Sequence, residues 1–231
     1  MLDHLQKYFR AFMTPIARVL HRWGVGPDAI TIGGTIVAVA LAMGLLPTGH
    51  VMLGGVLIGV FALFDSLDGT LARLSGRTGP WGAFLDATLD RITDGAVFAG
   101  IAAWFMLHQE GAWQIWGMIA TLWCMALGAV VPYAHARAEA VGASARVGLT
   151  GRADRLVIAL TPLGFTQFGL PVLVLLICLT LLALTTFITV WMRIAVVRKQ
   201  LGSDEARNAA QAEAEALALV GPVDEMERGD G

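Results

Sequence analysis

Long apolar runs separated by short polar links make up most of this sequence. A helix that spans a bilayer needs about 20 predominantly apolar residues. Six runs come close to that length or exceed it, at roughly 29–47, 51–74, 82–108, 112–136, 153–168 and 170–196. The fifth run is the shortest and contains Pro162, so a tilted or broken helix is expected there. We therefore predict an all-α integral membrane protein with six transmembrane helices.

The two ends of the chain differ from this apolar body. Residues 1–22 mix apolar residues such as Leu5 and Phe9 with basic residues such as Lys7 and Arg10, which is typical of an amphipathic helix in the membrane interface. Residues 201–231 are rich in alanine and acidic residues, which predicts a surface helix to about 220 and then a disordered segment. The expected parts are a juxtamembrane helix over 1–22, a six-helix domain over 23–200 and an acidic cytoplasmic tail over 201–231.

The composition excludes several classes of protein. Of the 231 residues, 56% are hydrophobic and 15% are charged, whereas soluble domains carry about 25% charged residues. This excludes an ordinary soluble domain and a disordered chain. The formal net charge of -2 and the lack of a basic stripe argue against a nucleic-acid binder. The two cysteines, Cys124 and Cys178, lie in apolar runs and are too few for a disulfide framework or a cysteine-based zinc site.

Basic residues are distributed unevenly between the links. The links near 47–50, 108–111 and 167–170 contain no Lys or Arg, whereas the links 73–81 and 137–155 contain several arginines. Cytoplasmic loops of membrane proteins carry the excess of Lys and Arg. We therefore expect a multi-pass protein of the cell membrane, with both termini and the arginine-rich links in the cytoplasm.

Five aspartates lie inside two consecutive apolar segments, where each charge costs about 2.5–3.5 kcal/mol. They are Asp65, Asp68, Asp86, Asp90 and Asp94. Residues three or four apart share a helix face. The short link over 74–81 predicts that the two helices are antiparallel neighbours, with both carboxylate groups near their cytoplasmic ends. Clustered carboxylates repel one another and require positive charge, and all-oxygen ligation favours Mg²⁺ or Mn²⁺. The alternatives are a structural network of salt bridges or an ion pathway.

The order Asp65-x2-Asp68-Gly69-x2-Ala72-Arg73-x8-Gly82-x3-Asp86-x3-Asp90 resembles the CDP-alcohol phosphatidyltransferase signature at every fixed position. The resemblance implies a six-helix membrane enzyme with a site on the cytoplasmic side, a CDP-linked lipid donor, release of CMP and two divalent metal ions. It also implies roles for the four motif aspartates. All four, Asp65, Asp68, Asp86 and Asp90, are expected to bind the metals, and Asp90 is also expected to act as the general base. Asp94 lies outside the signature, and it either orients Arg91 or extends the polar face.

A second resemblance concerns the nucleotide. The segment Gly26-Pro27-Asp28-Ala29-Ile30-Thr31 opens the first apolar run, and Asp28 is well placed to be the N-cap of that helix. The segment resembles a Pro-Asp-x-x-Thr sequence that lines the nucleotide in part of the family. The expected nucleotide contacts are therefore Asp28, Thr31, Gly69 and Arg73, with capping alone as the alternative role of Asp28.

The acceptor alcohol is predicted from basic residues at the ends of the later helices. Arg137, Arg155 and Arg193 are expected at one cytoplasmic mouth, where guanidinium geometry suits a phosphate. Positive-inside topology is the alternative explanation. A phosphate site favours inositol phosphate or glycerol phosphate as the acceptor over alcohols without phosphate.

Much of residues 14–195 resembles one branch of the family, the actinobacterial phosphatidylinositol phosphate synthases. The segments that carry this resemblance are 14–18, 86–91, 94–98, 136–140 and 155–156. In that branch, residues matching Arg155 and Arg193 bind the acceptor phosphate, and a Lys helps from the position of His135. The substitution of His135 for this Lys is a departure, because histidine is near neutral at cytoplasmic pH.

The branch resemblance implies transfer of the phosphatidyl group from CDP-diacylglycerol to 1D-myo-inositol 3-phosphate, in a homodimer. The first alternative is a phosphatidylglycerophosphate synthase or another CDP-alcohol phosphatidyltransferase. The alternative outside the enzymes is a cation transporter. Transporter sites usually lie near the membrane midplane between paired broken helices, and this sequence shows neither feature.

Overall fold

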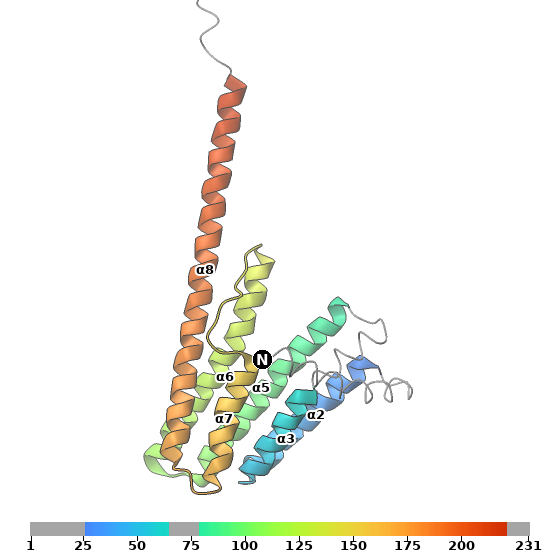
Figure 1. Ribbon diagram of the computed structural model, residues 1–231, viewed down its shortest axis with the longest axis vertical. Coiled ribbons are helices and arrows are strands. Elements are labelled where there is room, and N and C mark those ends of the chain that lie inside the picture. The colour runs from blue at the N-terminus through green and yellow to red at the C-terminus, as the bar shows by residue number, and fades with distance from the viewer. Residues whose placement is uncertain (1–25, 65–78, 221–231) are drawn as a thin grey trace, which may run out of the picture.

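The computed structural model describes residues 26–64 and 79–220, and in these ranges it contains helices and no strand (Figure 1). The helices are α2 (Pro27–Leu45), α3 (Val51–Phe64), α5 (Pro80–His108), α6 (Gly111–Ala140), α7 (Arg152–Thr166) and α8 (Val172–Val220). They confirm the all-helical class, and their bounds follow the apolar runs closely wherever the runs are described, except that α8 continues well beyond residue 196. The predicted juxtamembrane helix over 1–22 lies outside the described residues.

The helices run up and down past one another, so that their ends gather at two opposite ends of the bundle (Figure 1). Helix α5 packs against α2 and α6, helix α8 packs against α6 and α7, and helix α3 packs against α2 and α7. The expected pairing of α3 with α5 is therefore not among the main contacts between the described helices. Both helices instead pack against α2.

A close approach explains why α5 packs on α2. A Cβ atom added at Gly100 of α5 would lie 2.6 Å from the carbonyl oxygen of Ala42 on α2, so only glycine permits this contact. Small residues let helices approach closely in membrane proteins. Helices α3 and α5 nevertheless run in opposite directions, so the end of α3 and the start of α5 lie toward the same end of the bundle (Figure 1).

The interior is apolar, and so is much of the outer surface. The buried core includes Leu46, Ile58, Phe98, Phe105 and Leu163. Large apolar side chains are also exposed all around the bundle, with Phe168 exposed by 72% and Trp191 by 65%. Soluble monomers rarely expose contiguous apolar surface on this scale. The outer surface is therefore suited to lipid.

Three helices are long and apolar enough to cross a membrane, over Asp28–Leu45, Gly111–Ala140 and Val172–Ser203, and Val51–Ala62 is a shorter apolar helix. Helix α5 has sufficient length, but four charged residues, Asp86, Asp90, Arg91 and Asp94, lie in its first half. Helix α7 has 15 residues, or about 22 Å at 1.5 Å per residue, whereas the hydrocarbon core is about 30 Å thick. The described structure thus contains three clear candidate spans.

The last apolar run and the tail form one helix. Helix α8 has 49 residues and ends at Val220, which corresponds to about 74 Å, and it extends well beyond the rest of the bundle (Figure 1). A helix to about 220 was predicted, but as a separate surface element after residue 200. The alanine-rich sequence after residue 201 favours continued helix, so no break occurs there.

Candidate active site

Three aspartates of α5 lie on successive turns of one helix face. Asp86 and Asp90 are half-buried, and Asp94 is buried with 9% of its surface exposed. The helix begins with Gly79 as its N-cap and Pro80 in its first turn, where proline is favoured because its missing N–H would have no helical partner. The four-residue spacing therefore places these carboxylates in the first four turns of α5, near its N-terminal end.

Two arginines from the start of α7 face these carboxylates. Arg152 lies with Nη1 at 2.6 Å from Oδ1 of Asp90, and it donates a hydrogen bond from Nε to Oδ1 of Asp94 at 3.0 Å. Arg155 is only 3% exposed and donates from Nη2 to Oδ2 of Asp94 at 3.4 Å. Charge-assisted contacts of this kind are stronger than neutral hydrogen bonds. The α5 carboxylates and the α7 arginines therefore form one charged network.

The first turn of α7 is fixed locally, which explains how both arginines reach α5. Gly151 is the N-cap, and its backbone N–H donates to Oδ2 of Asp154 at 2.8 Å. Asp154 also places a negative charge in the first turn, which the helix dipole favours. Arg152 and Arg155 are three residues apart and share a helix face. The cap sets where the helix starts and thereby sets the direction of both side chains.

Asp94 has a larger role in this network than its sequence position indicated. Its Oδ2 lies 3.6 Å from Nη1 of Arg91, in line with the expected orientation of that arginine. The additional contacts with Arg152 and Arg155 were not predicted. The sequence contained a signal for these contacts. Asp90 and Asp94 are four residues apart and Arg152 and Arg155 are three residues apart, so each pair shares one helix face. The sequence does not indicate which helices meet, so this match was not recognised.

The four residues predicted to bind the acceptor phosphate are only partly brought together. Arg193 of α8 donates from Nε to the carbonyl oxygen of Val147 at 2.9 Å and from Nη1 to the carbonyl oxygen of Val131. His135 lies one turn beyond Val131 on α6, and its Nε2 is 3.5 Å from Oε1 of Glu139.

Arg155 approaches the same side of α6. A Cβ atom at Gly128, one turn before Val131, would lie 3.6 Å from Nε of Arg155. Arg155, Arg193 and His135 are therefore arranged along one stretch of α6. Arg137 is exposed and is about 200° around the helix from His135 at 100° per residue. The structure thus leaves Arg137 apart from the other three residues.

The predicted nucleotide contacts lie at the start of α2, as far as they are described. Helix α2 has Gly26 as its N-cap, so the prediction of Asp28 as the N-cap is wrong. Pro27 occupies the first helical position, where it is favoured, and this moves Asp28 into the first turn. Its Oδ2 accepts a hydrogen bond from Nε1 of Trp81 at 3.0 Å, which connects the starts of α2 and α5.

Thr31 lies one turn after Asp28 on α2 and is buried. Gly69 and Arg73, the other two residues of the predicted nucleotide set, are outside the described residues. The described half of the set therefore lies at the end of the bundle where α5 begins.

The described residues supply two of the four predicted metal ligands. Asp86 and Asp90 are oxygen donors one turn apart on α5, which suits Mg²⁺ or Mn²⁺. The other two, Asp65 and Asp68, follow Phe64 and lie outside the described residues. Within 26–64 and 79–220 no group of three or more His, Cys, Asp or Glu side chains is close enough to hold a metal ion. Asp86 and Asp90 fit a divalent cation in donor type and spacing, as half of the predicted ligand set.

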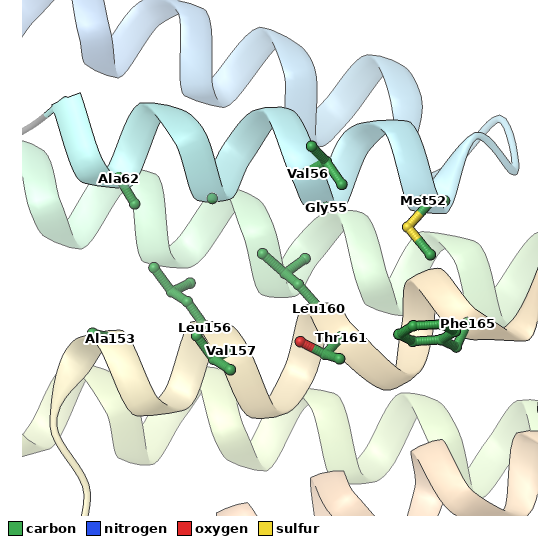
Figure 2. A pocket seen from close by; sticks show the side chains of 11 residues that line it. Met52, Gly55, Val56, Ala62, Ala153, Leu156, Val157, Leu160, Thr161 and Phe165 are labelled. Atoms are coloured by element: carbon green, nitrogen blue, oxygen red, sulfur yellow. The ribbon is translucent and has the colours of Figure 1, made fainter.

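An apolar groove of about 470 Å³ lies between α3 and α7 (Figure 2). Ala62 and Ala153 lie toward one end of the groove, and Met52 and Phe165 lie toward the other (Figure 2). Its walls include the small residues Gly55 and Gly59 and, apart from Thr161, consist of apolar residues and glycine. Ala153 directly follows Arg152 in the first turn of α7, so one end of the groove lies at the same turn of α7 as an arginine of the charged network.

The sequence is similar to those of known proteins. Residues 25–197 match the family model of CDP-alcohol phosphatidyltransferases. The chain is 41% identical over 217 residues to the phosphatidylinositol phosphate synthase of Streptomyces avermitilis. The aligned region covers 90% of this chain and 88% of that protein. It is also 41% identical over 196 residues to the protein of the same name from Mycobacteroides abscessus, covering 84% and 87% of the two chains.

Solved structures are similar over the same region. A crystal structure of Mycobacterium tuberculosis phosphatidylinositol phosphate synthase in complex with manganese and citrate has a TM-score of 0.75 and 42% identity, covering 80% of this chain and 88% of that one. A second crystal structure of that protein, with CDP-DAG bound, has the same TM-score and identity and is covered over 92% of its length. These similarities confirm the resemblance inferred from the aspartate signature, and the chain belongs to the CDP-alcohol phosphatidyltransferase family.

Proposed function

We propose that this protein is a phosphatidylinositol phosphate synthase, which transfers the phosphatidyl group from CDP-diacylglycerol to 1D-myo-inositol 3-phosphate and releases CMP. The observation that carries the proposal is the direct contact between the carboxylates of α5 and the arginines of α7. Asp90, the proposed base, lies 2.6 Å from Arg152, and Arg152 is on the same turn of α7 as Arg155, a proposed acceptor ligand. The identity of about 41% to phosphatidylinositol phosphate synthases supports the same assignment.

The proposed reaction is a substitution at phosphorus. A hydroxyl oxygen of the acceptor forms a bond to the phosphorus that carries the diacylglycerol, and the bond from that phosphorus to the oxygen shared with CMP breaks. The acceptor hydroxyl loses its proton to Asp90, and CMP leaves with the shared oxygen. A carboxylate within hydrogen-bond reach contributes typically 10²–10⁴-fold to such a step. Arg155 and Arg193 hold the acceptor phosphate and so direct the hydroxyl toward the donor.

Two divalent ions, Mg²⁺ or Mn²⁺, complete the proposed site. Asp86 and Asp90 would hold them together with Asp65 and Asp68, and the ions would neutralise the diphosphate and the charge that develops on CMP. Asp28 and Thr31 of α2 would contact the nucleotide together with Gly69 and Arg73. The manganese complex of the Mycobacterium tuberculosis protein supports a divalent metal at this site.

The groove between α3 and α7 suits one acyl chain of the lipid donor. It is apolar along most of its length, and Ala153, which lies toward one of its ends, directly follows Arg152 in the chain (Figure 2). A diphosphate held at the charged network would thus have an apolar channel for its lipid tail directly next to it. The volume of about 470 Å³ lies within the range of about 300–1,000 Å³ that is usual for small-molecule sites.

The groove is tested by filling it. A Cβ atom at Gly59 would meet no other atom within 4 Å, so a leucine there fits the backbone and extends into the groove. Displacing about two methylene groups of the lipid costs about 1.6 kcal/mol, so Gly59→Leu should raise the KM for long-chain CDP-diacylglycerol by about tenfold, and less for a short-chain donor. Gly44→Leu on α2 is the matched control, because Gly44 is exposed and equally open. Equal KM values for both variants would contradict this role.

The membrane arrangement is part of the same proposal. We propose six transmembrane helices in the plasma membrane, with both termini and the active site in the cytoplasm. The turns over 46–50, 109–110 and 167–171 contain no Lys or Arg, whereas the described arginines and Lys199 lie toward the opposite end of the bundle, in agreement with the positive-inside rule. The homodimer is proposed on the family resemblance alone.

The function is tested by CMP release from purified full-length protein in detergent, with CDP-diacylglycerol and one acceptor at a time. Inositol phosphate should support turnover with Mg²⁺ or Mn²⁺, and excess EDTA should abolish it. Inositol without phosphate and serine should not support turnover. Faster turnover with glycerol 3-phosphate would instead identify a phosphatidylglycerophosphate synthase. Absence of CMP release with every acceptor, together with metal-dependent cation uptake into vesicles, would favour a transporter.

A further inference from the structure

We propose that Arg152 is a positioning residue for the reaction, which orients the Asp90 carboxylate and couples it through Asp94 to Arg155. The proposal rests on the proposed function, because that function makes Asp90 the base and Arg155 an acceptor ligand. Arg152 itself is not part of the aspartate signature, and no sequence motif discussed above assigns it a role. Its position is apparent only once α5 and α7 are seen to meet.

Two contacts fix the guanidinium group of Arg152. Arg152 reaches two carboxylates on successive turns of α5 with two different nitrogen atoms, Nη1 toward Asp90 at 2.6 Å and Nε toward Asp94 at 3.0 Å. A guanidinium group is planar, so two contacts through separate nitrogens fix its orientation as well as its position. A lysine at this position has a single point of charge and would not hold both carboxylates in the same way.

Asp94 contacts both Arg152 and Arg155. Its Oδ1 faces Arg152, while its Oδ2 lies 3.4 Å from Nη2 of Arg155. The side chain of Asp94 is 12% exposed and that of Arg155 is 4% exposed, so this pair is held inside the protein, where screening by water is weak. If Arg155 moves when it binds a phosphate, Asp94 and then Arg152 would transmit this movement to Asp90.

The two carboxylate oxygens of Asp90 face two different arginines. Oδ1 faces Arg152 of α7, whereas Oδ2 lies 3.5 Å from Nη2 of Arg91 on its own helix. Arg91 is on the same helix as Asp90, so their contact does not fix the position of the carboxylate relative to α7. The contact with Arg152 does fix that position, because Arg152 belongs to α7. Because the start of α7 is fixed by the Gly151–Asp154 cap, Arg152 is the group that places the base relative to the acceptor arginine.

The proposal predicts a split between kcat and KM. Arg152→Gln should lower kcat by about tenfold or more, since small misplacements of a reacting group are costly, while the KM for the acceptor stays within about threefold. Arg152→Lys should recover only part of kcat. Added guanidinium should partly restore kcat to Arg152→Ala. The matched control is Arg146→Gln, whose side chain is 79% exposed and lies 4.0 Å from Glu139. We expect it to behave like wild type.

Two results would overturn this role. If Arg152→Gln and Arg152→Ala lower only the midpoint of thermal unfolding and leave kcat unchanged, the network is purely structural. If they raise the acceptor KM with kcat unchanged, Arg152 is an acceptor ligand and not a positioning residue. Failure of the proposed function is separately visible, because wild-type protein would then turn over glycerol 3-phosphate and not inositol phosphate. The split between kcat and KM is measured with whichever alcohol the wild type uses.

Discussion

Replacing Asp90 by asparagine should reduce turnover by about 10²–10⁴-fold, the usual contribution of a general base. Asparagine has nearly the same shape as aspartate, but it cannot accept the proton of the acceptor hydroxyl. It also carries no charge to hold Arg152, which now lies 2.6 Å from the carboxylate. The measurement is the initial rate of CMP release at saturating donor and acceptor, with binding of CDP-diacylglycerol and the midpoint of thermal unfolding recorded for the same preparation.

The controls separate chemistry from folding. Glu110→Gln removes a carboxylate at the opposite end of the bundle, where α6 begins, and Glu110 makes no side-chain cap. This variant should keep the wild-type rate. Asp90→Asn should retain donor binding, because Asp86 and the signature residues outside α5 remain. A folded Asp90→Asn protein that keeps more than about a tenth of the wild-type rate would exclude Asp90 as the base.

The sequence predicted the local structure well because membrane helices are specified by local patterns. An apolar run of sufficient length has to be helical in lipid, since every backbone N–H and C=O must be satisfied within the segment. The bounds of α2, α5 and α6 therefore follow from their runs. The same reasoning placed Asp86, Asp90 and Asp94 on one face of a helix, because that face depends only on spacing.

Contacts between helices could not be predicted in this way. The short link over 74–81 suggested α3 as the neighbour of α5, and the apolar pattern does not reveal that Gly100 lets α5 pack closely on α2. The position of Arg152 opposite Asp90 depends on where the first turn of α7 meets α5, and so does the burial of Arg155 against Asp94. The N-cap of α2 was misassigned for a local reason, because Pro27 starts the helix one residue before Asp28.

The proposed acceptor site predicts a change in affinity for the alcohol and little change for the donor. Arg155 and Arg193 reach α6 at neighbouring turns, next to Gly128 and at Val131. If both bind the acceptor phosphate, loss of either removes a charge-assisted contact of about 1.5–3 kcal/mol. Arg155→Ala and Arg193→Ala should each raise the KM for inositol phosphate by about tenfold or more, with the KM for CDP-diacylglycerol nearly unchanged.

Both arginines also hold the fold together, so the alanine variants need partners that preserve the charge. Arg155 is bonded to buried Asp94, and Arg193 connects α8 to Val131 of α6 and to Val147. Arg155→Lys and Arg193→Lys keep the positive charge and should show smaller increases in KM than the alanine variants. The control is Arg198→Ala, which removes an exposed arginine of α8 five residues beyond Arg193 and should leave both KM values unchanged.

His135 provides a test in the opposite direction, by a gain of affinity. Its Nε2 lies 3.5 Å from Glu139, and its Nδ1 is buried without a hydrogen-bond partner among the described residues. Replacement by lysine introduces a permanent positive charge at the position where the resemblance to the phosphatidylinositol phosphate synthases implies one. His135→Lys should therefore maintain or lower the KM for inositol phosphate, whereas His135→Ala should not lower it.

The initial rate as a function of inositol phosphate concentration decides the question for all of these variants. Unchanged acceptor KM values in folded Arg155→Ala and Arg193→Ala proteins would assign these arginines to structure and topology alone, and the phosphate would have to bind elsewhere.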